Sequence, residues 1–261
     1  MQLTGAQILV ETLCEQGVDT VFGYPGAVML PVYDALYDRQ DRIRHILTTH
    51  EQGAAHAADG YARASDRVGV CMATSGPGAT NLVTGIAAAF LDSVPMVCIT
   101  GQVPLTQIGT DSFQEVDTTG ITQPITKHNV IVQRVEALAP ILRQAFQLAQ
   151  AGRPGPVLVD VPGDVLKAVG CYTPQTPVAR TWTSRETLEA QQGKYLDRAA
   201  DMLRKARRPA ILVGGGVIRG QAAEALRQVA ERLQAPVAST LMGLGAFPTT
   251  HPLYTGMLGL H

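Results

Sequence analysis

A single carboxylate stands out among the residues that could do chemistry. Glu51 lies at the start of an expected helix, directly after an expected strand, in the stretch Thr49-His50-Glu51-Gln52-Gly53. The free N–H groups and the dipole of a helix start favour a carboxylate, so an isolated Glu there often only complements the dipole. Glu51, however, follows the carboxyl end of a strand beside two Gly-rich loops. That position favours a working carboxylate in an α/β enzyme.

Two further loops have the composition of ligand-binding turns. Ser75-Gly76-Pro77-Gly78 joins a strand to a helix, and its small residues allow a ligand to approach the backbone. This signal is weak alone, because the loop has neither the GK[ST] of a Walker motif nor the G-x-G-x-x-G fingerprint. Gly214-Gly215-Gly216 also lies between a strand and a helix. A tight turn and a contact with a diphosphate or dinucleotide are equally good interpretations of it.

The elements that must position these loops alternate along the first 162 residues. We expect strands at 18–22, 43–48, 68–73, 94–100, 130–133 and 157–161, with helices at 4–17, 29–37, 50–64, 79–91 and 136–151. Short apolar strands alternating with helices predict an α/β fold, a doubly wound parallel sheet covered on both faces. Ligand sites in such sheets lie at the carboxyl ends of the strands. The long irregular stretch 102–123 is of a kind that is often functional.

The character of the sequence changes after residue 162. Residues 163–192 are rich in Pro, Thr, Gln and Ser and are expected to link two domains, 1–162 and 193–261. The second domain begins a new α/β unit, with strands at 209–213 and 236–239 and helices at 195–205 and 221–233. A doubly wound domain does not usually stop after two strands. We therefore expect this domain to be truncated in the sequence.

The composition excludes several classes of function. Lys and Arg number 21 against 22 Asp and Glu, so no basic excess exists for binding nucleic acid. The four cysteines lie far apart without a CxxC, which fits a reduced, cytoplasmic setting. No segment resembles a signal peptide or a membrane span. The six histidines form no ligand-spaced cluster, so no metal site is predicted.

Many short stretches occur in the order and spacing of one family. They include Phe22-Gly23-Tyr24-Pro25-Gly26, His50-Glu51-Gln52-Gly53, Thr74-Ser75-Gly76-Pro77-Gly78-Ala79-Thr80-Asn81, Ile108-Gly109-Thr110-Asp111, Phe113-Gln114-Glu115, Ile125-Thr126-Lys127-His128, Gly152-Arg153-Pro154-Gly155-Pro156 and Leu241-Met242-Gly243-Leu244-Gly245. Together they resemble the thiamine-diphosphate-dependent carboligases and decarboxylases, and among these the catalytic large subunits of the acetolactate (acetohydroxyacid) synthase family. The resemblance runs through the whole chain and corresponds to the N-terminal portion of that family.

The resemblance implies roles for individual residues. Domain 1–162 would bind the aminopyrimidine of the cofactor, with Glu51 as the catalytic group at the pyrimidine N1′. Its other implied cofactor contacts are Pro25, Gly26, Pro77 and Asn81, with Arg153, Gly214, Gly215 and Gly216 beside a structural FAD. The implied substrate pocket contains Gly26, Ala27, Phe113, Gln114 and Lys127. The start of the second domain, 193–261, would be associated with FAD.

The resemblance also implies a reaction and partners. The family decarboxylates pyruvate and joins the two-carbon unit to pyruvate or 2-ketobutyrate, in valine and isoleucine biosynthesis. Its Mg²⁺ and diphosphate are held by a Gly-Asp-Gly…Asn segment that this sequence does not contain, so the chain alone is expected to be inactive. We expect a cytoplasmic homodimer or homotetramer formed through the first domain, with a possible regulatory small subunit. The alternatives are a noncatalytic cofactor-binding or assembly module, another thiamine-diphosphate decarboxylase or oxidase, or an α/β protein that binds NAD or FAD alone.

Overall fold

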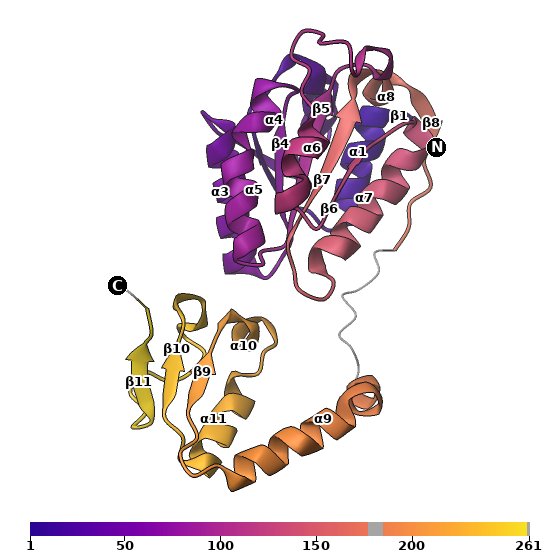
Figure 1. Ribbon diagram of the computed structural model, residues 1–261. Helices are drawn as coiled ribbons and strands as arrows, with labels where there is room; N and C mark the ends of the chain where they lie inside the picture. Colours follow the sequence, from indigo (N-terminus) through magenta and orange to yellow (C-terminus); the bar gives the residue numbers. More distant parts are fainter. Residues whose placement is uncertain (177–184, 260–261) are drawn as a thin grey trace. The chain divides into compact units, whose positions relative to one another are not determined.

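The structure, a computed structural model, describes residues 1–176 and 185–259 (Figure 1). The chain divides into two compact units, Met1–Thr181 and Trp182–His261, which are described separately. Among the described residues, none of the helices combines the length and apolar character that a transmembrane helix needs.

The first unit is built on the predicted six-stranded parallel sheet. Its strands are β2 (Thr20–Gly23), β3 (Arg44–Leu47), β4 (Gly69–Ala73), β5 (Met96–Gln102), β6 (His128–Ile131) and β7 (Pro156–Pro162). They lie in the order β3-β2-β4-β5-β7-β6. Every residue of β4, β5 and β7 is buried. This burial on both faces explains why the sequences of these strands are nearly continuous apolar runs.

Helices cover both faces of this sheet, as the doubly wound prediction requires. One face packs against α1 (Gly5–Glu15), α2 (Leu30–Tyr37) and α7 (Val135–Gln150). The other face packs against α3 (Glu51–Ser65) and α5 (Val83–Leu91). The buried residues of α3 are mostly alanines, and this small side chain lets the helix lie close to the strands. A Cβ added at Gly69 would lie only 2.1 Å from the Ala58 carbonyl oxygen.

The first helix shows how local sequence determines an element. Thr4 Oγ1 accepts from Gln7 N at 3.2 Å, and the Gln7 side chain accepts from Thr4 N at 3.0 Å. This reciprocal capping box satisfies two N–H groups that an α-helix leaves without intrahelical partners. Gly17 ends the segment with a φ of +74°, a conformation that favours glycine.

The predicted linker differs from the structure at its beginning. Residues 163–171 belong to the first unit as α8 (Gly163–Lys167) and β8 (Val169–Cys171). Strand β8 pairs antiparallel with β1 (Gln2–Thr4), which was also not predicted. Strands of three residues are too short to show periodicity, and this pairing joins the two ends of the unit. Residues 177–184 of the predicted linker lie outside the described part.

The second unit has one strand more than predicted. Its elements are α9 (Arg185–Lys205), β9 (Ile211–Val213), α10 (Gly215–Arg219), α11 (Ala223–Leu233), β10 (Val237–Ser239) and β11 (Tyr254–Met257). The strands form a parallel sheet in the order β11-β10-β9. Helix α9 begins earlier than the helix expected at 195–205, and β11 had no clear apolar pattern.

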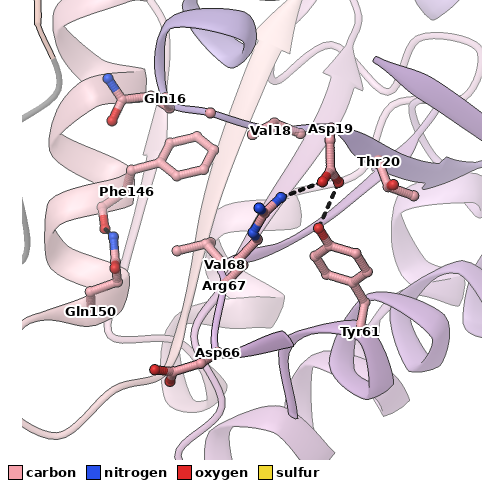
Figure 2. Close-up of a pocket in the computed structure, with 11 residues that line it drawn as sticks. Gln16, Val18, Asp19, Thr20, Tyr61, Asp66, Arg67, Val68, Phe146 and Gln150 are labelled. Carbon is pink, nitrogen blue, oxygen red and sulfur yellow. Dashed lines mark hydrogen bonds and ion pairs between the residues drawn. The ribbon is translucent and has the colours of Figure 1, made fainter. Parts of the chain in front are cut away.

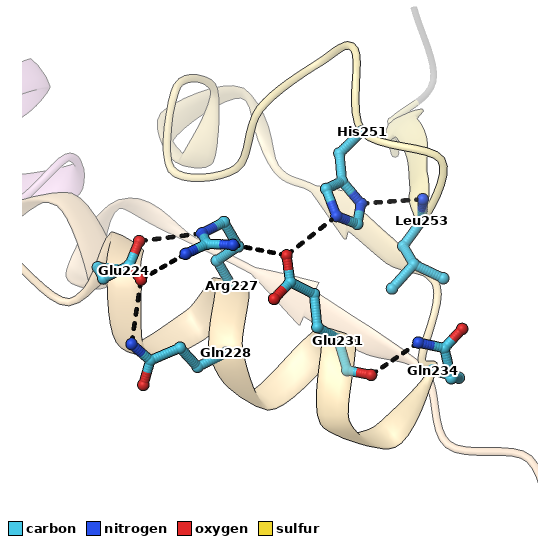
Figure 3. Close-up of polar contacts among 7 residues, drawn as sticks. All are labelled: Glu224, Arg227, Gln228, Glu231, Gln234, His251 and Leu253. Carbon is cyan, nitrogen blue, oxygen red and sulfur yellow. Dashed lines mark hydrogen bonds and ion pairs between the residues drawn. The ribbon is translucent and has the colours of Figure 1, made fainter.

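A chain of charged groups fastens the turn before β11 to α11 (Figure 3). Arg227 bonds to Glu224 and, at 2.7 Å, to Glu231. His251 Nδ1 accepts from Leu253 N at 3.2 Å, so in the neutral ring Nε2 carries the proton and donates to Glu231 at 3.3 Å. These groups bind one another and serve the packing of this unit.

The remaining short elements belong to irregular stretches. Within 102–123 and just beyond it lie η2 (Leu105–Gln107), α6 (Thr118–Thr122) and η3 (Gln123–Ile125). The turn after β2 contains η1 (Ala27–Met29), the turn after β4 contains α4 (Pro77–Asn81), and η4 (Leu241–Gly243) follows β10.

Candidate functional site

Glu51 is a buried carboxylate held by a side chain from the next loop. It is the first residue of α3, with only 8% of its surface exposed, and the helix is capped by His50, whose Nδ1 accepts from Gln52 N. Asn81 at the end of α4 donates from Nδ2 to Glu51 Oε2 at 2.9 Å. The other oxygen, Oε1, faces Gly78, where an added Cβ would lie 3.2 Å from it. The structure therefore brings together Glu51 and Asn81, two predicted site residues that are 30 positions apart.

Two glycines, Gly26 and Gly78, pack against the side chain of Thr74 beside Glu51. A Cβ at Gly26 would lie 2.4 Å from the Thr74 side chain, and a Cβ at Gly78 would lie 2.8 Å from Thr74 Cγ2. We call these five residues the Glu51 group: Gly26, Glu51, Thr74, Gly78 and Asn81. They follow the carboxyl ends of β2, β3 and β4, which are neighbours in the sheet. The group thus lies where open α/β sheets place their ligands.

Buried hydroxyl groups that find no partner among the described residues lie in and beside the Glu51 group. Thr48, Thr74 and Ser75 each have a buried hydroxyl oxygen that makes no hydrogen bond within the described part of the chain, as does Tyr33. A Cβ at Gly23, at the end of β2, would lie 2.6 Å from the Tyr33 hydroxyl. Leaving a buried polar group unpaired costs about 1–3 kcal/mol. This edge therefore has hydrogen-bonding capacity that a polar ligand could use.

Three predicted pocket residues lie around the same edge. Gln114 has a φ of +58°, and a Cβ at Gly76 would lie 2.6 Å from its carbonyl oxygen, so this loop rests on the turn before α4. Phe113, next to it, is 88% exposed. Ala27 begins η1, and the adjacent Val28 contacts the Cβ position of Gly101 at the end of β5.

The two predicted prolines are placed by the same loops. Pro25 directly precedes Gly26 in the turn after β2. Pro77 is the first residue of α4, a position where its missing N–H is no loss.

Lys127 and Arg153 lie at the opposite, amino edge of the sheet, just before β6 and β7. Lys127 Nζ donates to the carbonyl oxygens of Leu148 and Ala151, the latter at 2.6 Å, and so stabilises the carboxyl end of α7. Burial lowers the pKa of this ammonium. Lys127 is therefore not brought together with Glu51, and we do not retain it as a pocket residue.

Arg153 has a similar structural role at the end of α5. Its Nε donates to Ser93 Oγ at 2.6 Å, and its Nη2 donates to the Leu91 carbonyl oxygen at 3.1 Å. Its guanidinium carbon also lies over the ring of Phe90, 5.9 Å from the ring centroid. These contacts account for an arginine at this position.

The three predicted glycines of the second unit, Gly214, Gly215 and Gly216, lie at the start of α10. A Cβ at Gly215 would lie 2.9 Å from the Met242 carbonyl oxygen, so close packing alone requires glycine there. Nothing lies within 4 Å of the Cβ position at Gly216, and Gly214 has only Thr240 Oγ1, at 3.8 Å. The tight-turn interpretation thus explains Gly215 and leaves Gly214 and Gly216 unexplained.

A hollow of about 330 Å³ also lies at the amino edge (Figure 2). Three of its polar lining groups bind one another: Arg67 and Tyr61 both donate to Asp19, Tyr61 at 2.6 Å. The hydrogen bond from Tyr61 is the main cause that lowers the pKa of Asp19. Because these groups satisfy each other, the hollow offers no reactive group comparable with Glu51.

Sequence reasoning named the loop Ser75-Gly76-Pro77-Gly78 without singling out Gly78 or the Ser75 hydroxyl, and it did not single out Thr48 or Thr74. Their signal is position, since Thr48 directly follows β3 and Thr74 directly follows β4. In the described ranges 1–176 and 185–259, no group of three or more His, Cys, Asp or Glu side chains could hold a metal ion.

Comparison with known proteins decides the family. Residues 3–121 match the thiamine pyrophosphate enzyme N-terminal TPP binding domain, and residues 196–261 match the thiamine pyrophosphate enzyme central domain. The chain belongs to the thiamine pyrophosphate enzyme family. Thiamine pyrophosphate is another name for thiamine diphosphate, so the family expected from the motifs is confirmed.

Similar proteins carry one name. The chain is 52% identical over 260 residues to an acetolactate synthase large subunit of Mycobacterium tuberculosis, covering 100% of this chain and 42% of that protein. It is 51% identical over 259 residues to the acetolactate synthase isozyme 2 large subunit of Escherichia coli, covering 99% of this chain and 46% of that protein. The isozyme 1 large subunit of the same organism is 50% identical over 260 residues, covering 100% and 45%. The chain therefore spans less than half the length of these relatives.

Proposed function

We propose that this chain provides the pyrimidine-binding half of the active site of an acetolactate synthase. The complete enzyme would decarboxylate pyruvate and join the two-carbon unit to pyruvate or 2-ketobutyrate, in branched-chain amino-acid biosynthesis. The names of the similar proteins support this reaction. The observation that carries the proposal is the buried carboxylate of Glu51, held by Asn81 among glycines and hydroxyls that have no partner within residues 1–176 and 185–259.

The Glu51 group fits the aminopyrimidine ring of thiamine diphosphate. Gly26 and Gly78 let the turns after β2 and β4 pack on Thr74 beside Glu51, and Glu51 Oε1 is the oxygen that Asn81 does not occupy. We assign Glu51 to hold a proton at the pyrimidine N1′, with Asn81 fixing the orientation of the carboxylate. The bound cofactor supplies an electron sink that allows the carboxyl group of a 2-keto acid to leave. Burial of Glu51 keeps water from competing with the pyrimidine N1′ for the carboxylate.

Other residues of the first unit would line the two sides of this group. Pro25 and Pro77 would contact the cofactor from the turns after β2 and β4. Ala27, Phe113 and Gln114 would face the 2-keto acid, since their loops rest on the same edge of the sheet. The aromatic ring of Phe113 is exposed and therefore free to contact a ligand or a second polypeptide.

The remaining cofactors and partners rest on the resemblance. Mg²⁺ and the cofactor diphosphate would be held by residues outside this chain, in the homodimer or homotetramer of the complete enzyme, with a regulatory small subunit as a further partner. FAD would lie beside Gly214–Gly216, of which Gly214 and Gly216 have space at their Cβ positions. Arg153 is a further FAD contact that the resemblance implies, and in the structure it donates to Ser93 and Leu91. We place the enzyme in the cytoplasm.

The test uses the full-length protein that contains this chain, with thiamine diphosphate, Mg²⁺ and FAD. Pyruvate should be converted to 2-acetolactate and carbon dioxide, and addition of 2-ketobutyrate should give 2-aceto-2-hydroxybutyrate. The 261-residue chain expressed alone should form neither product. Folded full-length protein that binds thiamine diphosphate but decarboxylates pyruvate without carboligation would indicate another member of the family. Absence of cofactor binding would indicate a noncatalytic module.

A further inference from the structure

Asp160 is a fully buried carboxyl group beneath the active edge of the sheet. It lies in β7 with no exposed surface, and both of its oxygens accept hydrogen bonds from β5. Thr100 Oγ1 lies 2.6 Å from Oδ1, and Gln102 Nε2 donates to Oδ2 at 2.9 Å. A buried polar network whose members are paired in this way makes the surrounding backbone rigid and favours one arrangement of it.

Gln102 connects Asp160 to the long loop that follows β5. Its Nε2 also donates to the Val116 carbonyl oxygen at 2.9 Å, and its Oε1 accepts from Val103 N at 2.9 Å. The amide orientation is therefore determined at both of its atoms. Asp160, through Gln102, fastens the far end of the segment 105–116, which we call the Phe113 loop.

The near end of the Phe113 loop is held from the same corner of the fold. Leu105 N donates to Asp164 Oδ2 at 3.1 Å, and Asp164 lies in α8, directly after β7. Two aspartates four positions apart, Asp160 and Asp164, thus hold the two ends of one loop. The loop is ordered internally as well, because Glu115 accepts from the backbone N–H groups of Thr110 and Ser112.

What the loop carries makes this clamp relevant to the active site. The Gln114 carbonyl lies against Gly76, in the turn that leads to Pro77 and Asn81. Phe113 projects beside it with 88% of its surface exposed. An 88% exposed side chain has few contacts of its own, so its place depends on how its loop is anchored.

We propose that Asp160 and Asp164 are positioning residues that clamp the Phe113 loop over the Gly76 turn and so place Phe113 and Gln114 beside Glu51. They act through Gln102 and the Leu105 amide and touch neither cofactor nor substrate. The catalytic part of this inference rests on the proposed function. The structural part, the clamp itself, does not.

The first test breaks the link without altering the carboxyl group. Gln102→Met in the full-length protein keeps the side-chain length but removes the N–H donors to Asp160 and Val116. Amide hydrogen exchange in residues 105–116, measured without substrate, should speed up by roughly tenfold. The KM for pyruvate should rise by a similar factor, with kcat and the affinity for thiamine diphosphate changing less than about threefold.

The matched control is Thr100→Val, which removes the other contact of Asp160 and leaves the Gln102 link intact. It should leave both the exchange of the Phe113 loop and the KM unchanged, even if the unfolding midpoint falls. Asp164→Ala is the second variant, placed on a partly exposed helix and useful if Gln102→Met does not fold. It should speed up exchange at the Leu105 end of the loop and raise the KM in the same direction.

Two results would overturn the clamp. One is a folded Gln102→Met or Asp164→Ala variant whose loop exchanges like the wild type. The other is a Thr100→Val variant that alters exchange and KM as much as Gln102→Met does. If the full-length protein forms no acetolactate, the proposed function fails, and the exchange measurement still decides the clamp.

Discussion

The two edges of the six-stranded sheet contain similar residue types and differ in how these residues are paired. At the carboxyl edge, Glu51 is held by one amide, and the hydroxyls of Thr74 and Ser75 have no partner within the described residues. At the amino edge, Asp19 accepts hydrogen bonds from Tyr61 and Arg67 (Figure 2). Lys127, at the same edge, caps the end of α7. A hollow and a few charges do not by themselves make a site. Buried polar atoms that lack partners are the better indicator.

Neutralising one carboxylate at each edge tests most directly whether only the carboxyl edge is functional. Glu51→Gln keeps the shape and removes the charge, so kcat of the full-length enzyme should fall by about 100-fold or more. Asp19→Asn, the control at the amino edge, should leave kcat unchanged and lower only the stability. Steady-state kinetics and cofactor titration calorimetry measure both effects. Near-normal turnover of Glu51→Gln would reverse the functional assignment of the two edges.

Asp160 provides a pH-dependent test of a buried group that does have partners. Burial is the main cause that raises its pKa from 3.8 to about 7, and Thr100 and Gln102 lower it in part. Between about pH 4 and 7 the unfolded chain has lost this proton and the folded chain keeps it. The contribution of this group to stability is therefore greatest at low pH and falls by about 1.4 kcal/mol for each pH unit in this window.

Asp160→Asn cannot titrate, and its amide can still accept from Gln102 and donate to Thr100. The variant should therefore gain stability over the wild type as the pH rises from 4 to 7, and the difference should level off above pH 7. Urea unfolding midpoints of both proteins across this range measure it. A difference that stays constant with pH would show that Asp160 is ionised throughout.

A pair of glycine substitutions tests the space at the carboxyl edge. Gly26→Ala places a methyl group 2.4 Å from the Thr74 side chain, which should cost about 1–3 kcal/mol in unfolding free energy and weaken cofactor binding. Gly53→Ala in α3 meets nothing within 4 Å and should stabilise by about 0.5–1 kcal/mol. The double variant Gly26→Ala/Thr74→Ala should recover part of the loss. Equal effects of the two single variants would contradict the close packing of Gly26 on Thr74.

The smallest effect is expected at the amino edge. Lys127→Met keeps the aliphatic contact with Gly155 and removes the ammonium from the end of α7, so stability should fall by about 0.3–1 kcal/mol. The KM for pyruvate should not change. A raised KM with unchanged stability would instead return Lys127 to the substrate pocket.

The sequence by itself determined the elements of this protein and the position of Glu51. Apolar runs predicted all six strands of the first sheet, and the capping box of Thr4 and Gln7 is present in the structure. These signals are local, since an apolar run and a helix cap each consist of residues within a few positions of one another. For the same reason, the helix that begins at Glu51 could be located from its immediate neighbours.

Only the tertiary structure decided which polar groups meet. Asn81 reaches Glu51 across 30 positions, and Gln102 reaches Asp160 across 58. Lys127 and Arg153 proved to cap helices because α7 and α5 end beside them. Nothing in a short stretch of sequence specifies such pairs, because they arise when distant strands become neighbours in one sheet. The pairing of polar atoms, which separates the two edges, is therefore a property of the folded chain.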